Sequence, residues 1–230
     1  MRLSSAVSDI PAVFWPRRFL VGLVATYAVV WVWAAWAPIY RFDWFLENIL
    51  TTITLVVLVA SYRRLPLSDI SYILLFLFLV LHAVGGHYTY SEVPVGFWVQ
   101  EALGLARNHF DRLVHFSFGF LLLYPMREVI IRSVTHNSFH AGLFAVCINC
   151  TGSGLFEIIE MIIAMIVNPE AGIAYLGTQG DEWDAQKDMA LAFAGSLIAF
   201  ALIELAVRTG LLDDYLLPPA SQIRRKRHVS

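Results

Sequence analysis

The chain has 230 residues, of which 58% are hydrophobic and 15% are charged, and its mean hydropathy is +0.65. Soluble domains average roughly 45–50% apolar and about 25% charged residues, so this composition excludes an ordinary soluble domain and is typical of a polytopic membrane protein. The net charge of −2 and the lack of a recognition motif exclude nucleic acid as a partner. The lipid bilayer is the expected partner, and the length fits one integral membrane domain over residues 1–230.

Six apolar segments are long enough to cross a membrane, which takes about 20 residues. They predict an all-α bundle of six transmembrane helices, at approximately 19–37, 44–62, 70–84, 111–124, 139–167 and 186–207. The fourth is expected to end at Tyr124, before Pro125. The first also resembles a signal peptide that is cleaved after Ala37, but its apolar run is longer than usual and Pro38 follows, which favours a retained helix.

The distribution of positive charge predicts the orientation of the spans. Twelve of the sixteen Lys and Arg residues lie in the N-terminal segment, in the second and fourth connections and in the C-terminal segment. Because cytoplasmic segments carry the excess of Lys and Arg, both termini are expected in the cytoplasm, with 218–230 as a basic cytoplasmic tail. The longest outer connection, about 85–110, is expected to be folded or re-entrant.

Three polar segments are expected to converge on the outer face, at Arg107–His115, Glu157–Glu160 and Gly180–Met189. Residues three or four apart share one face of a helix. The pairs with this spacing are Asp111 with His115, Glu157 with Glu160, and Asp184 with Asp188. Charged groups against or within a span are costly and usually have a partner or a function, so the three segments predict a site.

Carboxylates with imidazoles suit zinc, manganese or iron, and carboxylates alone suit magnesium or calcium. The candidate catalytic residues are Asp111, His115, Glu157, Glu160, Asp184 and Asp188. The candidate metal ligands are His87, Asp111, His115, Glu157, Asp181 and Asp184, and the candidate cofactor is a divalent metal. Two alternatives need no metal: a network of charges paired with Arg107, Arg112 and Lys187, and a proton or ion relay.

Two further motifs favour helix packing over chemistry. Cys147 and Cys150 have the spacing of a thiol pair, but they lie in an apolar segment, where a reactive thiol is not expected. Gly152-Ser153-Gly154 is similar to the serine motif of intramembrane proteases, but the sixth segment contains no partner histidine. Small residues of this kind let membrane helices approach closely.

The ordered motifs of the chain resemble those of the YjdF-like family of uncharacterised bacterial inner-membrane proteins. The residues that carry the resemblance are Gly86–Tyr90 with Val93-Pro94, Arg107–Phe116, and Gly180–Met189. This resemblance implies a polytopic inner-membrane protein and brings no agreed activity or assigned site residues. A weaker similarity is to VanZ-like membrane proteins, whose Asp-x-x-x-His-Phe pattern and later acidic segment correspond here to Asp111, His115, Phe116, Asp184, Asp188 and Gly195.

The sequence is compatible with three functions. The first is a metal-assisted membrane enzyme that acts on a lipid or envelope substrate. The second is a proton-coupled transporter, for which Glu157 and Glu160 within a span are the motivation. The third is a structural or accessory membrane protein whose charges fix the packing of its helices.

Overall fold

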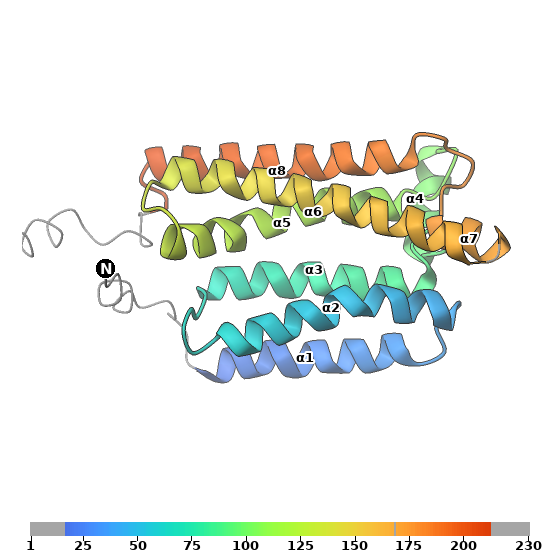
Figure 1. Cartoon of the computed structure of the whole chain (residues 1–230), viewed down its shortest axis with the longest axis horizontal. Helices are drawn as coiled ribbons and strands as arrows, with labels where there is room; N and C mark the ends of the chain where they lie inside the picture. Colours follow the sequence, from blue (N-terminus) through green and yellow to red (C-terminus); the bar gives the residue numbers. More distant parts are fainter. Residues whose placement is uncertain (1–16, 168, 213–230) are drawn as a thin grey trace, which may run out of the picture.

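The computed structural model describes residues 17–167 and 169–212 (Figure 1). These residues form eight helices and no strand: α1 (Arg17–Ala35), α2 (Arg41–Ser61), α3 (Asp69–Tyr88), α4 (Pro94–Leu103), α5 (Phe110–Ser133), α6 (Ser138–Ile166), α7 (Pro169–Leu176) and α8 (Asp184–Arg208). Within the same ranges, α1, α2, α3, α5, α6 and α8 are long and apolar enough to cross a membrane. The predicted all-α class with six spans is confirmed. The expected basic tail, 218–230, lies outside the described residues.

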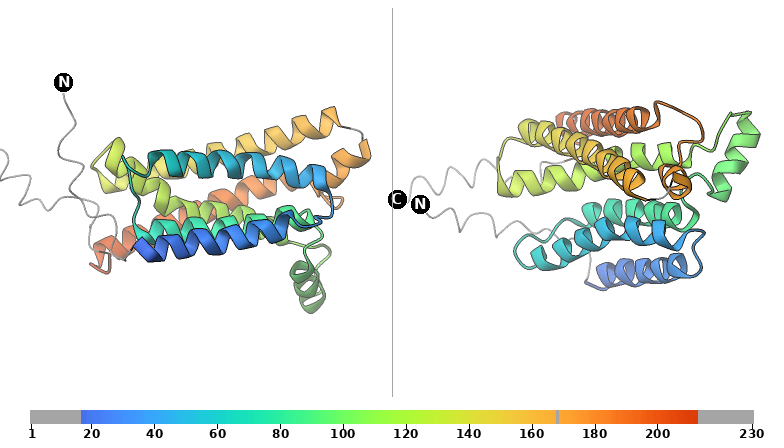
Figure 2. Two further views of the ribbon diagram at one scale, coloured as in Figure 1. Left: turned by 90° about the horizontal axis from the view of Figure 1, so that it is seen from below. Right: turned by 45° about the vertical axis from the view of Figure 1, so that its right-hand side comes forward.

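The six long helices run side by side in two groups, with α1, α2 and α3 in one and α5, α6 and α8 in the other (Figure 1). α3 joins the groups because it packs against both α1 and α5. The short helices α4 and α7 lie at the end of the bundle opposite the first residues of α1 and the last residues of α8 (Figures 1 and 2). The segments that were expected to converge all lie at the end that carries α4 and α7.

α5 and α8 pack closely because glycines stand where the two helices cross. A Cβ atom on Gly119 of α5 would lie 1.8 Å from the carbonyl oxygen of Ala192, and one on Gly195 of α8 would lie 2.3 Å from that of Phe116. Asn149 of α6 donates a hydrogen bond to the carbonyl oxygen of Gly119 at 3.2 Å. Small residues and interhelical hydrogen bonds of this kind drive helix association within a membrane.

α5 is longer than the sequence predicted. The expected end at Tyr124 is wrong, because the helix continues through Pro125 to Ser133. Proline removes one backbone hydrogen bond, but membrane helices tolerate this when neighbouring helices enclose the site. Here Pro125 is buried, and the extra turns carry Ile130 and Ile131 into the core formed with α6 and α8.

The start of α3 is fixed by a carboxylate that the sequence reasoning missed. Glu128 of α5 is 0% exposed and accepts hydrogen bonds from the backbone N–H of Ser68 at 2.8 Å and from Arg132 at 3.1 Å. The hydroxyl of Ser68 donates to the same carboxylate at 2.7 Å, and that of Ser71 also donates to it. A carboxylate at a helix N-terminus satisfies N–H groups that have no partner inside the helix.

The outer connection contains α4, in agreement with the expected folded loop. Pro94 occupies the first turn, where its missing N–H costs nothing, and Gly104 ends the helix in the left-handed conformation at φ 62°. α4 projects from the end of the bundle (Figure 2) and exposes Trp98 and Leu103. Exposed aromatic and apolar side chains at this level are typical of a membrane interface.

Candidate functional site

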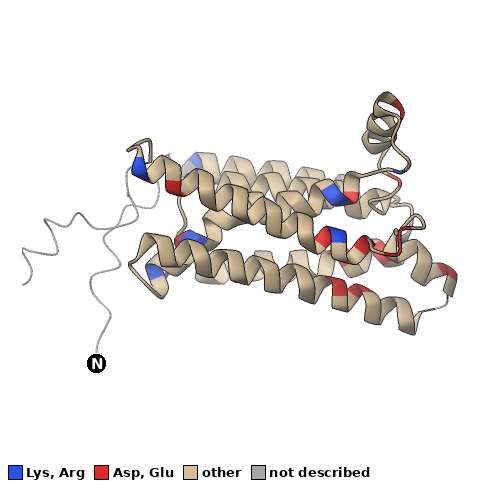
Figure 3. Cartoon of the chain, turned by 90° about the horizontal axis from the view of Figure 1, so that it is seen from above, with Lys and Arg blue, Asp and Glu red and all other residues tan. Residues whose placement is uncertain are grey.

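Acidic side chains gather at the end of the bundle that carries α4 and α7 (Figure 3). α5 and α8 both begin there, and α6 presents its last turns to them. The described part of the chain thereby brings residues of the three polar segments into two adjoining layers. An outer layer consists of ion pairs, and an inner layer consists of carboxylates around one histidine.

The outer layer is a network of arginines and aspartates. Arg107 is 8% exposed and Asp184 is 4% exposed, and the guanidinium contacts both carboxylate oxygens, at 2.5 and 3.3 Å. Arg112 contacts Asp181 and, at 3.3 Å, Asp184. Lys187 completes the network at 2.6 Å from Asp181. These are the cations of the paired-charge interpretation, and in the described residues their ion pairs all go to Asp181 and Asp184.

Backbone groups tie the same layer to the segment before α8. Arg107 donates to the carbonyl oxygen of Thr178 at 2.7 Å. The Asn108 N–H donates to the Gln179 side chain at 3.1 Å, and Gln179 donates back to the Asn108 carbonyl at 2.9 Å. The segment is thus fixed in place before α8 begins, which sets the direction in which the first turns of α8 present their side chains.

Charges in the outer layer shift the pKa values of two of its half-buried members, Asp181 and His109. Hydrogen bonds from Lys187, the Trp183 N–H and Arg112 hold the pKa of Asp181 well below its usual range. His109 has a lowered pKa because it is partly buried and lies close to Arg112 and Arg107. Nη1 of Arg112 lies 3.2 Å from Nδ1 of His109, a contact in which the histidine nitrogen acts as the acceptor.

The inner layer surrounds His115, one turn into α5. Nε2 of His115 lies 3.5 Å from Oδ1 of Asp111 on its own helix and 3.5 Å from Oε1 of Glu157 on α6. Asp111, His115 and Asp188 each offer one ligand atom, and these three atoms lie within 4.8 Å of one another. Asp188, on α8, is 2% exposed. Three helices therefore supply carboxylates to one imidazole.

Two oxygens of the inner layer lack a hydrogen-bond partner although they are buried. They are Oδ1 of Asp188 and Oε1 of Glu157. A buried charged oxygen without a partner is costly, so a group that satisfies both is expected at this point. The second carboxyl of α6, Glu160, stands three residues after Glu157, so the two carboxyl groups share one face of the helix.

A second buried chain of polar groups lies beside the inner layer. Nε2 of His82 lies 3.2 Å from the carbonyl oxygen of Glu47, so this nitrogen carries a hydrogen. Nδ1 of His82 lies 2.7 Å from the hydroxyl of Tyr90, which in turn lies 3.2 Å from Oε2 of Glu47. Burial and the neighbouring Glu47 raise the pKa of Tyr90 well above its usual value, so the phenol keeps its proton.

Local backbone geometry explains how Tyr90 reaches this position. Thr89 and Tyr90 both adopt left-handed conformations, at φ 57° and 40°, which turn the chain back over the end of α3. The Tyr90 ring then covers Gly85, where a Cβ atom would lie only 2.3 Å from it. Left-handed conformations are unfavourable for residues with a Cβ atom, and such strain often occurs at functional sites.

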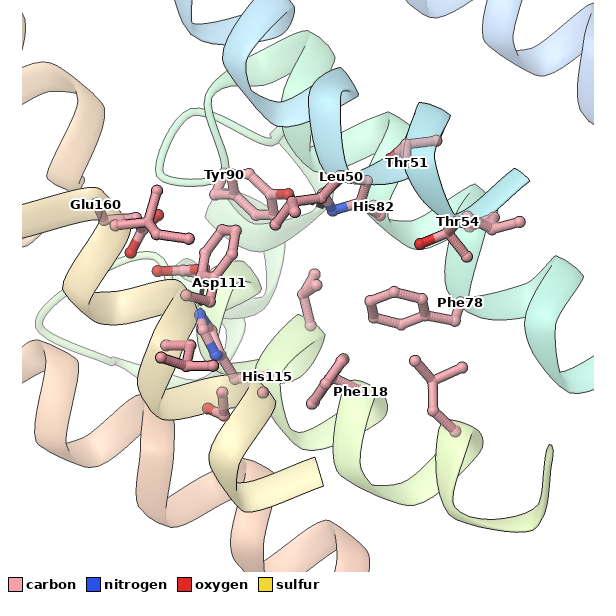
Figure 4. Close-up of a pocket in the computed structure, with 18 of the residues that line it drawn as sticks. Leu50, Thr51, Thr54, Phe78, His82, Tyr90, Asp111, His115, Phe118 and Glu160 are labelled. Carbon is pink, nitrogen blue, oxygen red and sulfur yellow. Dashed lines mark hydrogen bonds and ion pairs between the residues drawn. The ribbon is translucent and has the colours of Figure 1, made fainter. Parts of the chain in front are cut away.

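The polar groups close one end of a cavity of about 400 Å³ between α2, α3, α5 and α6. Its polar lining includes His82, Tyr90, Asp111, His115 and Glu160 (Figure 4). Most of the remaining wall is aliphatic or aromatic. Cavities of a few hundred Å³ with few polar groups are the usual form of small-molecule sites.

The candidate residues from the sequence are thus divided among different places. Asp111, His115, Glu157 and Asp188 meet in the inner layer, with Glu160 beside them. Asp181 and Asp184 are bound to arginines. His87 lies apart, where its Nδ1 is 3.0 Å from the carbonyl oxygen of Ala34 and its ring stacks on Trp33. The metal ligands that the geometry favours are therefore Asp111, His115 and Asp188, with Glu157 adjacent.

Glu47 is the site residue that sequence reasoning missed. Asp43 stands four residues before it, at the same helical spacing as Asp184 and Asp188, but just outside the apolar segment 44–62. The buried position of Glu47 in a span was the available signal, because an ionisable residue there is generally functional.

Comparison with known proteins gives a family and one relative. The family described as "Predicted membrane protein (DUF2238)" matches residues 19–209. The "Inner membrane protein YjdF" of Escherichia coli (strain K12) is 40% identical over 158 residues, which cover 68% of this chain and 75% of that protein. No solved structure matches the chain. The match to the family spans all six long helices.

Proposed function

We propose that this chain, which belongs to the DUF2238 family of predicted membrane proteins, is a metal-assisted membrane enzyme that acts on a lipid or cell-envelope substrate. The observation that carries the proposal is the grouping of Asp111, His115 and Asp188 within 4.8 Å at the polar end of an apolar cavity. A substrate with an apolar chain and a reactive head would place the head against these residues.

We place both termini in the cytoplasm and the site near the outer surface of the inner membrane. The excess of Lys and Arg in the segments at the terminal end of the bundle supports this orientation. The name of the Escherichia coli relative supports the choice of membrane. The site would then face substrates of the outer leaflet or of the cell envelope.

The side chains of the inner layer fit a divalent cation. Ligand atoms about 2.1 Å from one ion lie roughly 3.4 Å apart in a tetrahedral site. The 3.5 Å separation of His115 Nε2 from Oδ1 of Asp111 is close to that value. A cation and its coordinated water would also satisfy the buried oxygens of Asp188 and Glu157 that have no hydrogen-bond partner. Imidazole with carboxylates suits zinc, manganese or iron.

The residues around the ligands have distinct roles in this proposal. A bound divalent ion supplies Lewis acidity and lowers the pKa of a coordinated water. Glu157, whose Oε1 lies 3.5 Å from Nε2 of His115, is placed to take a proton from that water as a general base, and Glu160 lies on the same face of α6. Arg107 is a positioning residue, because its pairing with Asp184 fixes the first turn of α8, one turn before Asp188.

The proposal predicts metal-dependent turnover of envelope lipids. Proteoliposomes that contain the protein and an extract of bacterial envelope lipids are incubated with zinc, manganese or iron, and products are identified by mass spectrometry. Conversion should require the ion and be abolished by a chelator and by Asp188→Asn. The control is Glu182→Gln, which changes an exposed carboxylate near α8. Conversion by Asp188→Asn at the wild-type rate would contradict the proposal.

A proton-coupled carrier is the second candidate, and the chain Glu47–Tyr90–His82 favours it. The phenol has one proton and two partners, so a proton can move between Glu47 and His82 without a change in total charge. The carboxyl of Glu160, which lines the same cavity as His82 and Tyr90, adds a second group that can hold a proton. Proton flux into liposomes that is unchanged by Glu157→Gln and Glu160→Gln would argue against transport.

A further inference from the structure

The cavity beside the inner layer has a wall that belongs to the outer surface of the protein. Leu155 and Ile159 of α6 line the cavity and are 54% and 42% exposed, and Leu50 of α2 lines it and is 39% exposed. α2 packs mainly against α3 and exposes the apolar side chains of its other faces. In a bilayer these surfaces face lipid, so the cavity is accessible from the membrane between α2 and α6.

The apolar part of the cavity suits a single hydrocarbon chain. Its wall includes Leu75, Phe78, Phe118 and Phe156, from α3, α5 and α6. Figure 4 shows Phe78 and Phe118 on the side away from Glu160 and Asp111. A volume of about 400 Å³ is at the lower end of the range for drug-sized ligands, which is roughly 300–1,000 Å³. It is therefore small for a lipid with two chains.

The polar residues at one end of the cavity determine which head group can bind there. Asp111 and Glu160 present carboxyl groups, and Lys and Arg are absent from the lining that the described residues form. Arg107 and Arg112 of the outer layer pair with Asp184 and Asp181. The carboxyl groups of the inner layer outnumber the two positive charges of a bound divalent ion, so a negatively charged head would still be repelled in surroundings of low dielectric constant. A head with O–H or N–H donors could instead donate hydrogen bonds to the carboxyl oxygens of Asp111 and Glu160.

We propose that the cavity binds a single-chain lipid whose head carries hydroxyl or ammonium donors and no net negative charge, and that this lipid enters from the bilayer between α2 and α6. The lipid is the substrate class of the proposed enzyme, so this inference rests on the proposed function. Beyond the proposed function, the inference specifies the charge of the lipid head, the number of its hydrocarbon chains and its route into the cavity.

The test measures competition for the cavity in phosphatidylcholine nanodiscs. Radiolabelled monomyristoylglycerol is displaced by unlabelled monomyristoylglycerol, by tetradecylamine or by myristate, which have chains of similar length and heads of different charge. Unlabelled monomyristoylglycerol and tetradecylamine should compete at least about tenfold more strongly than myristate, a difference of about 1.4 kcal/mol in binding free energy. Equal competition by myristate would overturn the assignment of the head group.

Two threonines of α2 provide a matched pair for the route of entry. Thr54 lines the cavity, whereas Thr52 is exposed and does not belong to the lining. Thr54→Trp should fill the opening and reduce binding of monomyristoylglycerol at least about tenfold. Thr52→Trp should bind like the wild type. Equal binding by the two variants would overturn entry between α2 and α6.

Measurement with and without divalent ion separates this inference from the proposed enzyme. Binding of monomyristoylglycerol that is blocked by Thr54→Trp, in a protein that binds no zinc, manganese or iron, would support the lipid site and overturn the metal-assisted enzyme. Stoichiometric metal with no saturable binding of either monomyristoylglycerol or tetradecylamine would overturn the lipid site and leave the metal centre intact.

Discussion

Nη1 of Arg107 lies 2.5 Å from Oδ1 of Asp184, and both side chains are almost completely buried at the outer layer of the site. The pair joins the segment before α5 to the first turn of α8. Removing one partner of such a pair leaves an uncompensated charge in a buried place, which typically costs about 3–5 kcal/mol. The pair thus holds together the two helices that supply Asp111, His115 and Asp188.

Asp184→Asn should therefore lower the stability of the protein by about 3 kcal/mol or more. The measurement is thermal unfolding of the detergent-solubilised protein. The matched control is Glu182→Gln, which neutralises an exposed carboxylate two residues earlier and should leave the melting temperature almost unchanged. Equal melting temperatures for the two variants would show that Arg107 gains little from Asp184.

Glu128→Gln should destabilise the opposite end of the bundle. The amide would turn an N–H₂ group toward donors that now face a carboxylate, from Ser68, Ser71 and Arg132. The expected cost is about 2–4 kcal/mol, because several charge-assisted hydrogen bonds are lost in a buried place. Hydrogen exchange should accelerate at the start of α3. The control is Glu170→Gln, at an exposed carboxylate of α7, which should leave that exchange unchanged.

Gly119→Ala should separate α5 from α8. The added Cβ would lie 1.8 Å from the carbonyl oxygen of Ala192, which is part of the α8 backbone and cannot give way without moving the helix. A loss of about 1–3 kcal/mol or more is expected. Gly154→Ala is the control, since its Cβ would meet the Met189 sulfur at an ordinary 3.6 Å. Comparable thermal stability of the two variants would contradict close packing at Gly119.

Protonation of His109 should make the folded protein less stable at low pH. The free energy of unfolding should begin to fall below about pH 6.5, the usual pKa of histidine. The pKa of His109 is lowered in the folded protein, so below this pH the unfolded chain binds more protons than the folded chain. The charged groups around it are Arg107, Arg112, Asp181 and Asp184. The lowered pKa of Asp181 keeps it charged in this range, so its contribution is lost only at much lower pH.

Melting temperatures measured between about pH 7 and pH 5 should therefore decrease less in His109→Gln than in the wild type. The control is His136→Gln, at an exposed histidine at the other end of the bundle, which should keep the wild-type slope. If the melting temperature of His109→Gln falls with pH as steeply as that of the wild type, His109 is not the cause of the pH dependence.

The sequence predicted the parts of the fold that depend on local hydrophobicity, and those parts of the site that depend on helical spacing. The six spans follow from apolar length, and Asp111 and His115 share a face as their spacing requires. The continuation of α5 through Pro125 could not be predicted, because it depends on packing against α6 and α8. α7 begins at Pro169 and, with 8 residues, is too short to give a clear periodic signal.

The division of the acidic residues into two layers depends on contacts between distant segments. The spacing of Asp184 and Asp188 makes them equivalent, but Arg107 and Arg112 reach Asp184, while Asp188 lies one turn deeper, beside His115. Likewise, Glu47 meets His82 and Tyr90 only because the chain turns back at Thr89. Local patterns carry no information on such long-range pairings.

Metal analysis of the purified protein tests the central claim most directly. The protein is incubated with zinc, manganese or iron, dialysed, and analysed for metal content alongside Asp188→Asn and the control Glu182→Gln. We expect about one ion per chain in the wild type and in Glu182→Gln, and loss of that ion in a folded Asp188→Asn. A wild-type protein that retains none of the three metals in stoichiometric amount would contradict a metal centre at Asp111, His115 and Asp188.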